Sequence, residues 1–380
     1  MAKRRIHALV ILGTRPEAVK LAPVVHELLR RRARFRVTVC ATAQHRLLLD
    51  QVTQLFRIPV HLDLNLMTAG QTLDTLTARL MVRLSNVLRR RKPDVVIVQG
   101  DTTTVLVASL AAFYQRIPVA HVEAGLRTKD RFAPFPEEIN RRLTSHVADF
   151  HFAPTRWARR NLLREGIPAS RIFVTGNTVV DAFLAARKIV ARRPPRIASL
   201  RELDLRGKKL ILVTAHRREN FGAGMRGIAE ALARLARRED VEIVYPVHPN
   251  PNVTRPMHRA LDGLPRVRLI APLDYLQFVW LMMQAFLVLT DSGGVQEEMP
   301  SLGRPVLVMR EKTERPEGIE AGVCKLVGTN PAVIVREAQR LLDDPRAYRR
   351  IAHRGNPFGD GKAARRIVSI LAREIRNSSS

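Results

Sequence analysis

The stretch Val95-Val96-Ile97-Val98-Gln99-Gly100-Asp101 indicates most directly how this 380-residue chain folds. Its short run of Val and Ile is typical of a strand in a parallel sheet that is buried on both faces. The run ends at a glycine and a carboxylate, and in open parallel sheets ligands lie outside the carboxyl ends of the strands. The stretch therefore predicts a buried strand that leads into a binding or catalytic site.

Five further apolar runs also end at a residue able to bind an anion or move a proton. They are residues 8–12 before Gly13-Thr14-Arg15, 119–122 before Glu123, 210–213 before His216, 243–247 before His248, and 286–289 before Asp291-Ser292-Gly293-Gly294. Helical patterns alternate with these runs, as they do in βαβ units. We therefore predict an α/β enzyme with two Rossmann-like, doubly wound parallel sheets.

The strand–helix alternation occurs in two halves, which suits a length at which single cores usually split into domains. We predict an N-terminal domain of residues 1–176, a C-terminal domain of residues 177–361 and a final amphipathic helix of residues 362–376. The sequence Thr14-Arg15-Pro16-Glu17 has the form of a capping box, with Thr14 as the N-cap of the first helix.

The composition is that of an ordinary soluble protein, with 46% hydrophobic and 26% charged residues. The two cysteines, Cys40 and Cys324, lie far apart in the sequence and predict neither a disulfide framework nor a zinc site. We therefore expect a cytoplasmic protein. No apolar run approaches the roughly 20 residues that a membrane helix needs.

The net charge of +29 is the unusual feature of the composition. Such a charge suits a nucleic-acid-binding protein, and this alternative would explain it directly. However, the arginines are spread along the whole chain, aromatic residues make up only 5%, and no RNA- or DNA-binding motif is present. We favour a solvated, arginine-rich surface over a role with polyanions or acidic membranes.

Three carboxylates are candidates for acid–base chemistry. Asp101 and Glu123 each follow a buried strand, where a carboxylate without a task is uncommon. Glu137 opens a helix after Pro134-Phe135-Pro136, with Arg141 one turn later. It could act in the reaction, or it could simply complement the helix dipole and pair with Arg141.

The second half carries the features of an anion site. Ser292-Gly293-Gly294 follows a strand, and small residues there let backbone N–H groups approach a phosphate. Glu298 could accept hydrogen bonds from ribose hydroxyls, and His216 could neutralise a leaving group or simply cap the sheet edge. The segment 222–227 matches the dinucleotide pattern GxGxxG, but it starts well beyond its strand, so we interpret it as a loop feature that does not imply NAD.

Eight motifs, taken in order, resemble the non-hydrolysing UDP-N-acetylglucosamine 2-epimerases of bacteria. They are Gly13-Thr14-Arg15-Pro16-Glu17-Ala18, Gly100-Asp101-Thr102-Thr103-Thr104, residues 121–128, residues 136–141, Gly176-Asn177-Thr178, His216-Arg217-Arg218-Glu219, residues 291–298 and Thr313-Glu314-Arg315-Pro316-Glu317. The resemblance covers residues 6 to 370. It implies the glycosyltransferase-B fold, in which two domains enclose an interdomain cleft and the last helix packs back on the first domain.

The resemblance also implies roles for individual residues. The catalytic candidates are Asp101, Glu123, Glu137 and His216. The substrate-binding candidates are Arg15, Lys20, Arg141, Phe278, Ser292, Gly293, Gly294, Glu298 and Arg315. The second half is expected to bind UDP, with the diphosphate on Ser292-Gly293-Gly294 and the ribose on Glu298.

The implied reaction interconverts UDP-N-acetylglucosamine and UDP-N-acetylmannosamine, which supply cell-envelope polysaccharides. A C2 proton is removed and UDP leaves C1, giving 2-acetamidoglucal; UDP then re-adds as a proton returns to the opposite face of C2. Carboxylates can serve as base and acid while cations stabilise departing UDP. The scheme needs no metal and no redox cofactor, and it leaves open which carboxylate takes the proton. We expect a homodimer.

Some members of the family are activated by UDP-N-acetylglucosamine at a second site, parts of which match Gln44, Gln71 and His248. Leu47 and Gly70 stand where some regulated members have Gln and Arg, so activation of this protein stays an open question. The main alternatives to this assignment are a glycosyltransferase of the same fold and a hydrolysing epimerase. The first would transfer the sugar to an acceptor, and the second would release free N-acetylmannosamine.

Overall fold

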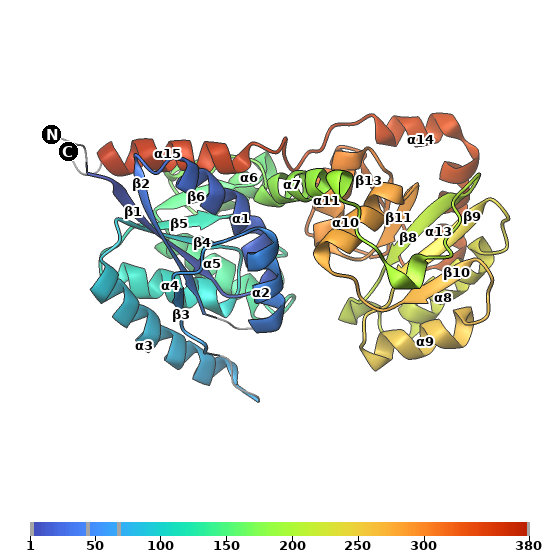
Figure 1. Ribbon diagram of the computed structural model, residues 1–380, viewed down its shortest axis with the longest axis horizontal. Helices are drawn as coiled ribbons and strands as arrows, with labels where there is room; N and C mark the ends of the chain where they lie inside the picture. Colours follow the sequence, from blue (N-terminus) through green and yellow to red (C-terminus); the bar gives the residue numbers. More distant parts are fainter. Residues whose placement is uncertain (1–3, 43–45, 67–69, 378–380) are drawn as a thin grey trace. The chain divides into compact units, whose positions relative to one another are not determined.

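The computed structural model describes residues 4–42, 46–66 and 70–377 (Figure 1). The chain divides into two compact units. Unit 1 comprises Met1–Ala182 together with Phe358–Ser380, and unit 2 comprises Phe183–Pro357. Each unit is built on one parallel β-sheet, so the predicted pair of Rossmann-like sheets is confirmed.

The described part of unit 1 has a seven-stranded parallel sheet with the order β3-β2-β1-β4-β5-β6-β7. Its strands are β1 (Ile6–Leu12), β2 (Phe35–Ala41), β3 (Leu62–Asp63), β4 (Val95–Gln99), β5 (Val119–Val122), β6 (Phe150–Ala153) and β7 (Ile172–Val174). Its helices are α1 (Arg15–Arg30), α2 (Arg46–Leu55), α3 (Leu73–Arg91), α4 (Thr103–Phe113), α5 (Glu137–Val147), α6 (Arg156–Arg164), η1 (Ala169–Arg171), the first residues of α7 (Thr178–Arg192), and α15 (Ala363–Asn377).

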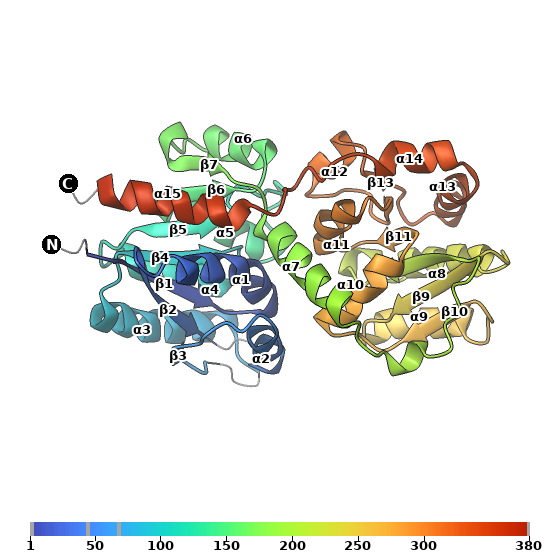
Figure 2. The same cartoon turned by 45° about the horizontal axis from the view of Figure 1, so that its top comes forward.

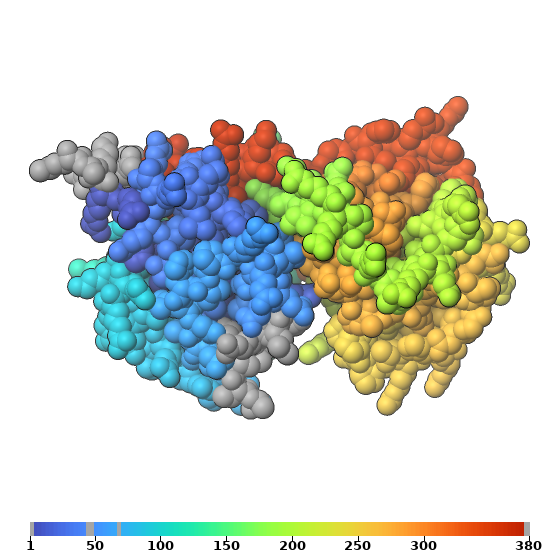
Figure 3. Space-filling view, viewed as in Figure 1, coloured from blue at the N-terminus to red at the C-terminus, as the bar shows by residue number. Residues whose placement is uncertain are grey.

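The helices of unit 1 pack on the sheet in groups. Helices α3, α4 and α5 are packed in sequence, and α15 packs against α1 (Figure 2). The space-filling view shows the C-terminal segment, in red, at the surface of unit 1 (Figure 3).

The described part of unit 2 has a six-stranded parallel sheet with the order β10-β9-β8-β11-β12-β13. Its strands are β8 (Lys209–Thr214), β9 (Val241–Pro246), β10 (Val267–Ile270), β11 (Leu287–Thr290), β12 (Val306–Val308) and β13 (Cys324–Leu326). Its helices are α8 (Ala223–Leu235), α9 (Pro251–Leu261), α10 (Tyr275–Gln284), α11 (Gly293–Glu298), α12 (Pro316–Glu320), α13 (Pro331–Asp343) and α14 (Pro345–Ala352), with 3-10 turns η2 (Ala198–Leu200), η3 (Arg218–Asn220) and η4 (Met299–Leu302).

The apolar runs of the sequence form the buried strands of both sheets. Every residue of β1, β4 and β11 is buried, which explains why these strands are apolar throughout instead of alternating. Helix α3 shows the other period: its buried residues Leu76, Leu80, Leu84 and Leu88 are spaced by four and form one stripe. Burial of each such leucine stabilises the fold by about 1.5–3 kcal/mol.

Two local predictions were wrong. Thr14 is the N-cap of α1, but its side chain makes no cap bond and instead donates to Glu17 Oε1 at 3.0 Å. Glu17 accepts from the backbone N–H of Gly13 at 2.6 Å, so the capping box does not form. The GxGxxG segment is not a loop feature, because most of it belongs to α8; an added Cβ at Gly227 would lie 2.3 Å from the carbonyl oxygen of Thr329.

The strand order creates one switch point in each sheet, where the chain changes direction. In unit 1 it lies between β1 and β4, and in unit 2 between β8 and β11. Ligands bind at such points in doubly wound sheets. At the first one an added Cβ on Gly13 would lie 2.7 Å from Thr104 Oγ1, so a glycine is required for the β1–α1 loop to meet the start of α4.

Both cysteines are buried and form no disulfide. Over the described ranges, no helix is both long enough and apolar enough to cross a membrane.

Candidate active site

Glu123 lies at the end of β5 and is enclosed by donors. Its Oε1 accepts hydrogen bonds from Lys20 Nζ at 2.5 Å and Asn177 Nδ2 at 2.9 Å, and its Oε2 accepts from Gln99 Nε2. The residue is only 7% exposed and has a φ of 65°, in the left-handed region that non-glycine residues rarely adopt. Such strained backbone is most often kept where function requires it, so this conformation marks Glu123 as a site candidate.

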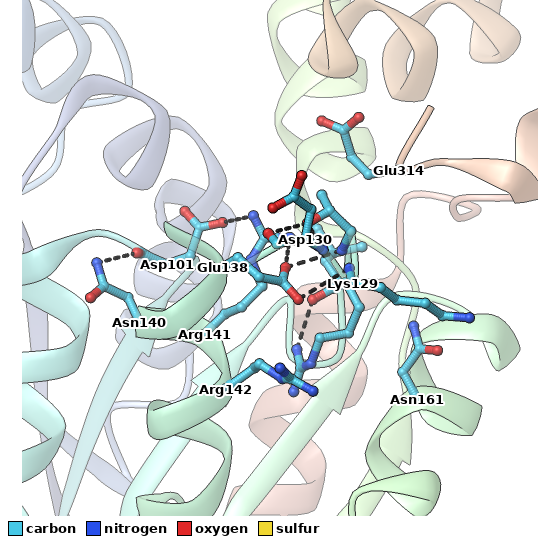
Figure 4. Close-up of polar contacts among 12 residues, drawn as sticks. Asp101, Lys129, Asp130, Glu138, Asn140, Arg141, Arg142, Asn161 and Glu314 are labelled. Carbon is cyan, nitrogen blue, oxygen red and sulfur yellow. Dashed lines mark hydrogen bonds and ion pairs between the residues drawn. The ribbon is translucent and has the colours of Figure 1, made fainter. Parts of the chain in front are cut away.

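Asp101 emerges beside Glu123, because β4 and β5 are neighbouring strands with Gln99 opposite Val122. Its Oδ2 lies 2.7 Å from Arg141 on α5, and its main-chain oxygen accepts from Asn140 Nδ2 at 3.0 Å (Figure 4). Arg141 is 5% exposed, so it meets Asp101 from within the protein. Helix α5 therefore positions Asp101, and Glu137, its first residue, is partly exposed.

Glu138, which is fully buried, ties the first turn of α5 to the preceding loop. Its carboxylate accepts from the backbone N–H groups of Thr128 at 3.0 Å and Lys129 at 3.3 Å, and lies 3.7 Å from Arg141 Nη1 (Figure 4). The adjacent acids of this motif thus differ: Glu138 holds the loop, whereas Glu137 remains partly accessible.

Glu17 joins the two loops at the switch point of unit 1. Besides Gly13 and Thr14, it binds Thr102, whose hydroxyl donates to Oε1 at 2.9 Å. Burial raises the pKa of Glu17 to about 7, and the nearby charge of Asp101 acts in the same direction, although the three hydrogen bonds oppose them. The loop that precedes Arg15 is thereby fixed to the loop that carries Asp101.

In unit 2 a buried carboxylate organises the switch point. Asp291 Oδ2 accepts from the backbone N–H groups of His216 at 2.9 Å and Arg217 at 2.8 Å, and from Asn220 Nδ2 at 3.1 Å. Burial lowers the pKa of His216, although Asp291, whose Oδ1 lies 3.7 Å from Nδ1, opposes this effect. The neutral form of the imidazole is thereby favoured, and its side chain is 40% exposed.

Arg315 lies across the start of α11. Its Nε donates to Glu297 Oε1 at 2.9 Å, and its Nη1 is 2.9 Å from Glu314. Burial alone would raise the pKa of Glu314, but Arg315, Arg310 and Arg217 outweigh it and lower that pKa to about 2. An added Cβ on Gly293 would lie 2.5 Å from the Arg315 guanidinium carbon, so only glycine permits this contact.

The remaining unit 2 candidates surround the same strand end. Ser292 and Gly294 are partly exposed, and an added Cβ on Gly294 would meet open space. Glu298 is 6% exposed and accepts a hydrogen bond from Tyr275 Oη at 3.0 Å. Phe278 lies one turn further along α10 and is partly exposed.

The three candidates for an activating site are placed differently. Gln44 lies outside the described residues, and Gln71 is partly buried just before α3. His248 stacks on His216 with ring centroids 5.5 Å apart, so a residue expected at a regulatory site contacts a catalytic candidate.

Sequence reasoning missed the side chains that hold the candidates in place: Gln99, Asn177, Glu17, Asp291 and Tyr275. Gln99 and Asp291 stand at strand ends, and Asn177 lies within a motif that the resemblance includes, so the sequence indicated where these residues lie. It did not indicate which groups they contact. Among the described residues, no three His, Cys, Asp or Glu side chains gather into a group that could hold a metal ion.

Two successive Rossmann-like units with polar side chains at both switch points define the class as a glycosyltransferase-B-type α/β enzyme. The family model for UDP-N-acetylglucosamine 2-epimerase matches residues 27–372. The chain is 55% identical to the UDP-N-acetylglucosamine 2-epimerase of Yersinia pestis over 96% of this chain and 97% of that protein. It is 54% identical to that of Escherichia coli K12 over the same shares.

Solved structures agree with the sequence comparisons. The UDP-GlcNAc 2-epimerase of Neisseria meningitidis, bound to UDP-GlcNAc, superposes with a TM-score of 0.90 at 45% identity, over 97% of this chain and all of that one. The enzyme of Methanocaldococcus jannaschii, in complex with UDP-GlcNAc and UDP, has a TM-score of 0.79 at 37% identity, over 96% and 99% of the two chains. The chain therefore belongs to the UDP-N-acetylglucosamine 2-epimerase family.

Proposed function

We propose that the protein interconverts UDP-N-acetylglucosamine and UDP-N-acetylmannosamine by elimination and re-addition of UDP. A base takes the proton from C2 while the C1–O bond to UDP breaks, which gives 2-acetamidoglucal and UDP. UDP then bonds to C1 again as an acid returns a proton to the opposite face of C2. The proposal rests chiefly on the ends of β4 and β5, where Asp101 and Glu123 are each held by a cation.

Unit 1 supplies the proton-transfer groups in this scheme. Asp101, Glu123 and Glu137 are the candidates for base and acid, and Lys20 and Arg141 hold two of them in place. A positioned acid or base contributes about 10²- to 10⁴-fold to a rate.

Unit 2 supplies the UDP site. The partly exposed residues Ser292 and Gly294 and the guanidinium of Arg315 suit the diphosphate. Glu298 suits the ribose, and the aromatic ring of Phe278, which is also partly exposed, suits uracil. His216 and Arg315 stabilise the negative charge that grows on UDP as the C1–O bond breaks; Arg15 adds a further cation.

The test is to incubate the purified protein with UDP-N-acetylglucosamine alone in D₂O and to resolve the products by NMR. UDP-N-acetylmannosamine that carries one deuterium at C2 is expected, without added metal or NAD. Free N-acetylmannosamine would indicate a hydrolysing enzyme, and product that keeps its original C2 hydrogen would contradict the mechanism.

We also propose that the enzyme is a cytoplasmic homodimer. Exposed apolar side chains on α3 and at the end of α4, namely Val82 (62% exposed), Phe113 (58%) and Tyr114 (67%), support self-association. Gln115 Nε2 donates to the carbonyl oxygen of Ser85 at 3.0 Å and joins the two helices there. Light scattering of the wild type and of a Phe113→Lys, Tyr114→Lys variant would test the dimer.

A further inference from the structure

Hydrogen bonds link Asn177 to three separate segments of the chain. Its Nδ2 donates to Glu123 Oε1 at 2.9 Å, its Oδ1 accepts from the backbone N–H of Val179 at 3.0 Å, and its own backbone N–H donates to the carbonyl oxygen of Phe358 at 2.7 Å. The residue is only 2% exposed. With these bonds, Asn177 connects three separate parts of unit 1.

Two of these parts are the places where the chain leaves and re-enters unit 1. Val179 lies in the first turn of α7, and the chain passes into unit 2 after Ala182 in that helix. Phe358 is the first residue after the chain returns. Asn177 therefore caps the outgoing helix with its side chain and holds the returning segment with its main chain.

The backbones around this junction are closely packed. An added Cβ on Gly176, whose φ is 90°, would lie 3.4 Å from the Cα of Gly359. Further along α7, Asp181 accepts from the backbone N–H groups of Ala363 at 3.2 Å and Ala364 at 3.0 Å, at the start of α15. The outgoing and returning segments are thus hydrogen-bonded to each other at two places, through Asn177 and through Asp181. The bond made by Asn177 is the one next to Glu123.

The third part is Glu123, whose orientation depends on the donors around it. Two further donors to Glu123, Lys20 on α1 and Gln99 on β4, belong to the interior of unit 1. Asn177 is the donor that links Glu123 to the outgoing and returning segments. A displacement of either segment would therefore move a hydrogen-bond partner of Glu123.

We propose that Asn177 is a positioning residue that ties Glu123 to both segments through which the chain passes between the units. The inference rests on the proposed function, in which Glu123 is a candidate acid or base. Asn177 does not contact the reacting atoms in this account. It acts through Glu123, and the chemical step is therefore expected to be more sensitive to it than substrate binding.

The variant Asn177→Asp separates the two roles of the side chain. It keeps an oxygen that can cap α7, but it replaces the donor to Glu123 by a carboxylate. Asn330→Asp is the matched control, because Asn330 caps α13 in the same way and hydrogen-bonds none of the candidate site residues. Its Oδ1 accepts from the backbone N–H of Ala332 at 2.9 Å and from that of Val333. Asn177→Ala removes both the cap and the donor.

For Asn177→Asp we expect kcat to fall at least about 10-fold with KM within about threefold of wild type. Its melting temperature should fall further than that of Asn330→Asp, because the new carboxylate is buried beside Glu123, and the kcat of Asn330→Asp should be unaffected. Asn177→Ala should lose both turnover and thermal stability. A kcat of Asn177→Asp within twofold of wild type would overturn the proposal, as would equal changes in kcat and KM.

A second measurement needs no turnover. Hydrogen exchange followed by mass spectrometry should show faster exchange at residues 178–183 and 358–364 in Glu123→Ala than in wild type, and no such change in Glu137→Ala. Unchanged exchange in Glu123→Ala would overturn the linkage. Because this experiment requires no substrate, it separates a failure of the linkage from a failure of the proposed epimerase activity.

Discussion

At the carboxyl edge of the unit 1 sheet, Lys20, Gln99 and Asn177 donate to Glu123, and Arg141 pairs with Asp101. The corresponding edge of unit 2 has the reverse arrangement. There Asp291 accepts from the backbone beside His216, while Glu297 and Glu314 hold Arg315. In these contacts donors position the carboxylates of Glu123 and Asp101 in unit 1, whereas carboxylates position Arg315 and the backbone at His216 in unit 2.

This difference indicates how the two units divide the chemistry. Carboxylates that are held by cations can exchange protons at a carbon atom, as the epimerisation of C2 requires. A guanidinium that is held in place suits the charge of a diphosphate, which needs to be stabilised as the C1–O bond breaks. We therefore expect substitutions in unit 1 to affect the chemical step, and those around the ribose in unit 2 to affect UDP binding.

The largest effect is expected from the carboxylates of unit 1. Asp101→Asn, Glu123→Gln and Glu137→Gln should each lower kcat by about 10²- to 10⁴-fold, because each change removes a group that can exchange a proton. The folded state should persist, since the substitutions are nearly isosteric. Steady-state assays of UDP-N-acetylmannosamine formation, with melting curves, would measure both.

Glu242→Gln is the matched control for Glu123→Gln. Glu242 on β9 is also a buried carboxylate, 3% exposed, and pairs with Lys208 at 2.6 Å, but it lies at the amino end of its strand, whereas the candidates follow the carboxyl ends of theirs. Glu242→Gln should lower the free energy of unfolding and leave kcat close to that of wild type. Near-normal turnover in all three unit 1 variants would contradict the division of chemistry.

A pH-dependent loss of stability is expected from Glu17. Its pKa is about 7 in the folded protein and about 4.5 when unfolded, so as pH rises between these values the unfolded state releases a proton that the folded state retains. Its contribution to stability is therefore complete below pH 4.5 and is lost, by up to about 3 kcal/mol, as pH rises through 7.

The isosteric variant Glu17→Gln cannot ionise, and its amide can still bind Gly13 and the threonine hydroxyls. Its melting temperature relative to wild type should therefore rise by several degrees between pH 5 and pH 8. Calorimetry at a series of pH values would test this. A difference between the two proteins that does not vary with pH would show that Glu17 is ionised in the folded state.

A smaller effect is expected from His216. Replacement by Gln keeps the backbone bond to Asp291 but removes the imidazole from the departing UDP, so kcat should fall about 10- to 100-fold. His258→Gln, on the exposed face of α9, is the control and should be neutral. An increase in KM alone for His216→Gln would contradict the proposed role of His216 in stabilising departing UDP.

The smallest effect is expected from Glu298. The ribose hardly changes during the reaction, so Glu298→Ala should raise KM by about 10-fold with kcat within about threefold of wild type. Steady-state kinetics over a wide range of substrate concentration would separate the two parameters. A fall in kcat without a change in KM would place Glu298 in the chemical step.

Most of the fold could be predicted from the sequence, because the apolar runs are short and unbroken. Residues 119–122 were predicted as a strand with the bounds that β5 has, and the other five runs lie within or overlap β1, β4, β8, β9 and β11. Local hydrogen bonds were harder to predict. Thr14 and Glu17 match a capping box, but a tertiary partner, Thr102, and the backbone N–H of Gly13 bind the Glu17 carboxylate instead.

The candidate residues could be chosen by their position after strands, but the groups that hold them could not. Asn177 lies 54 positions from Glu123, and Asp291 lies 75 from His216, so neither pair follows from local periodicity. Such contacts depend on strand order, which determines the loops that meet. The resemblance identified Asn177 as part of a motif without indicating what it binds.

The most direct test of the division between the units is calorimetric titration of UDP into Glu123→Gln and Glu298→Ala under the same conditions. Glu123→Gln should bind UDP within about threefold of the wild-type Kd, whereas Glu298→Ala should bind it at least about 10-fold more weakly. Unchanged UDP affinity in Glu298→Ala, or a loss of affinity confined to Glu123→Gln, would contradict the assignment of UDP binding to unit 2.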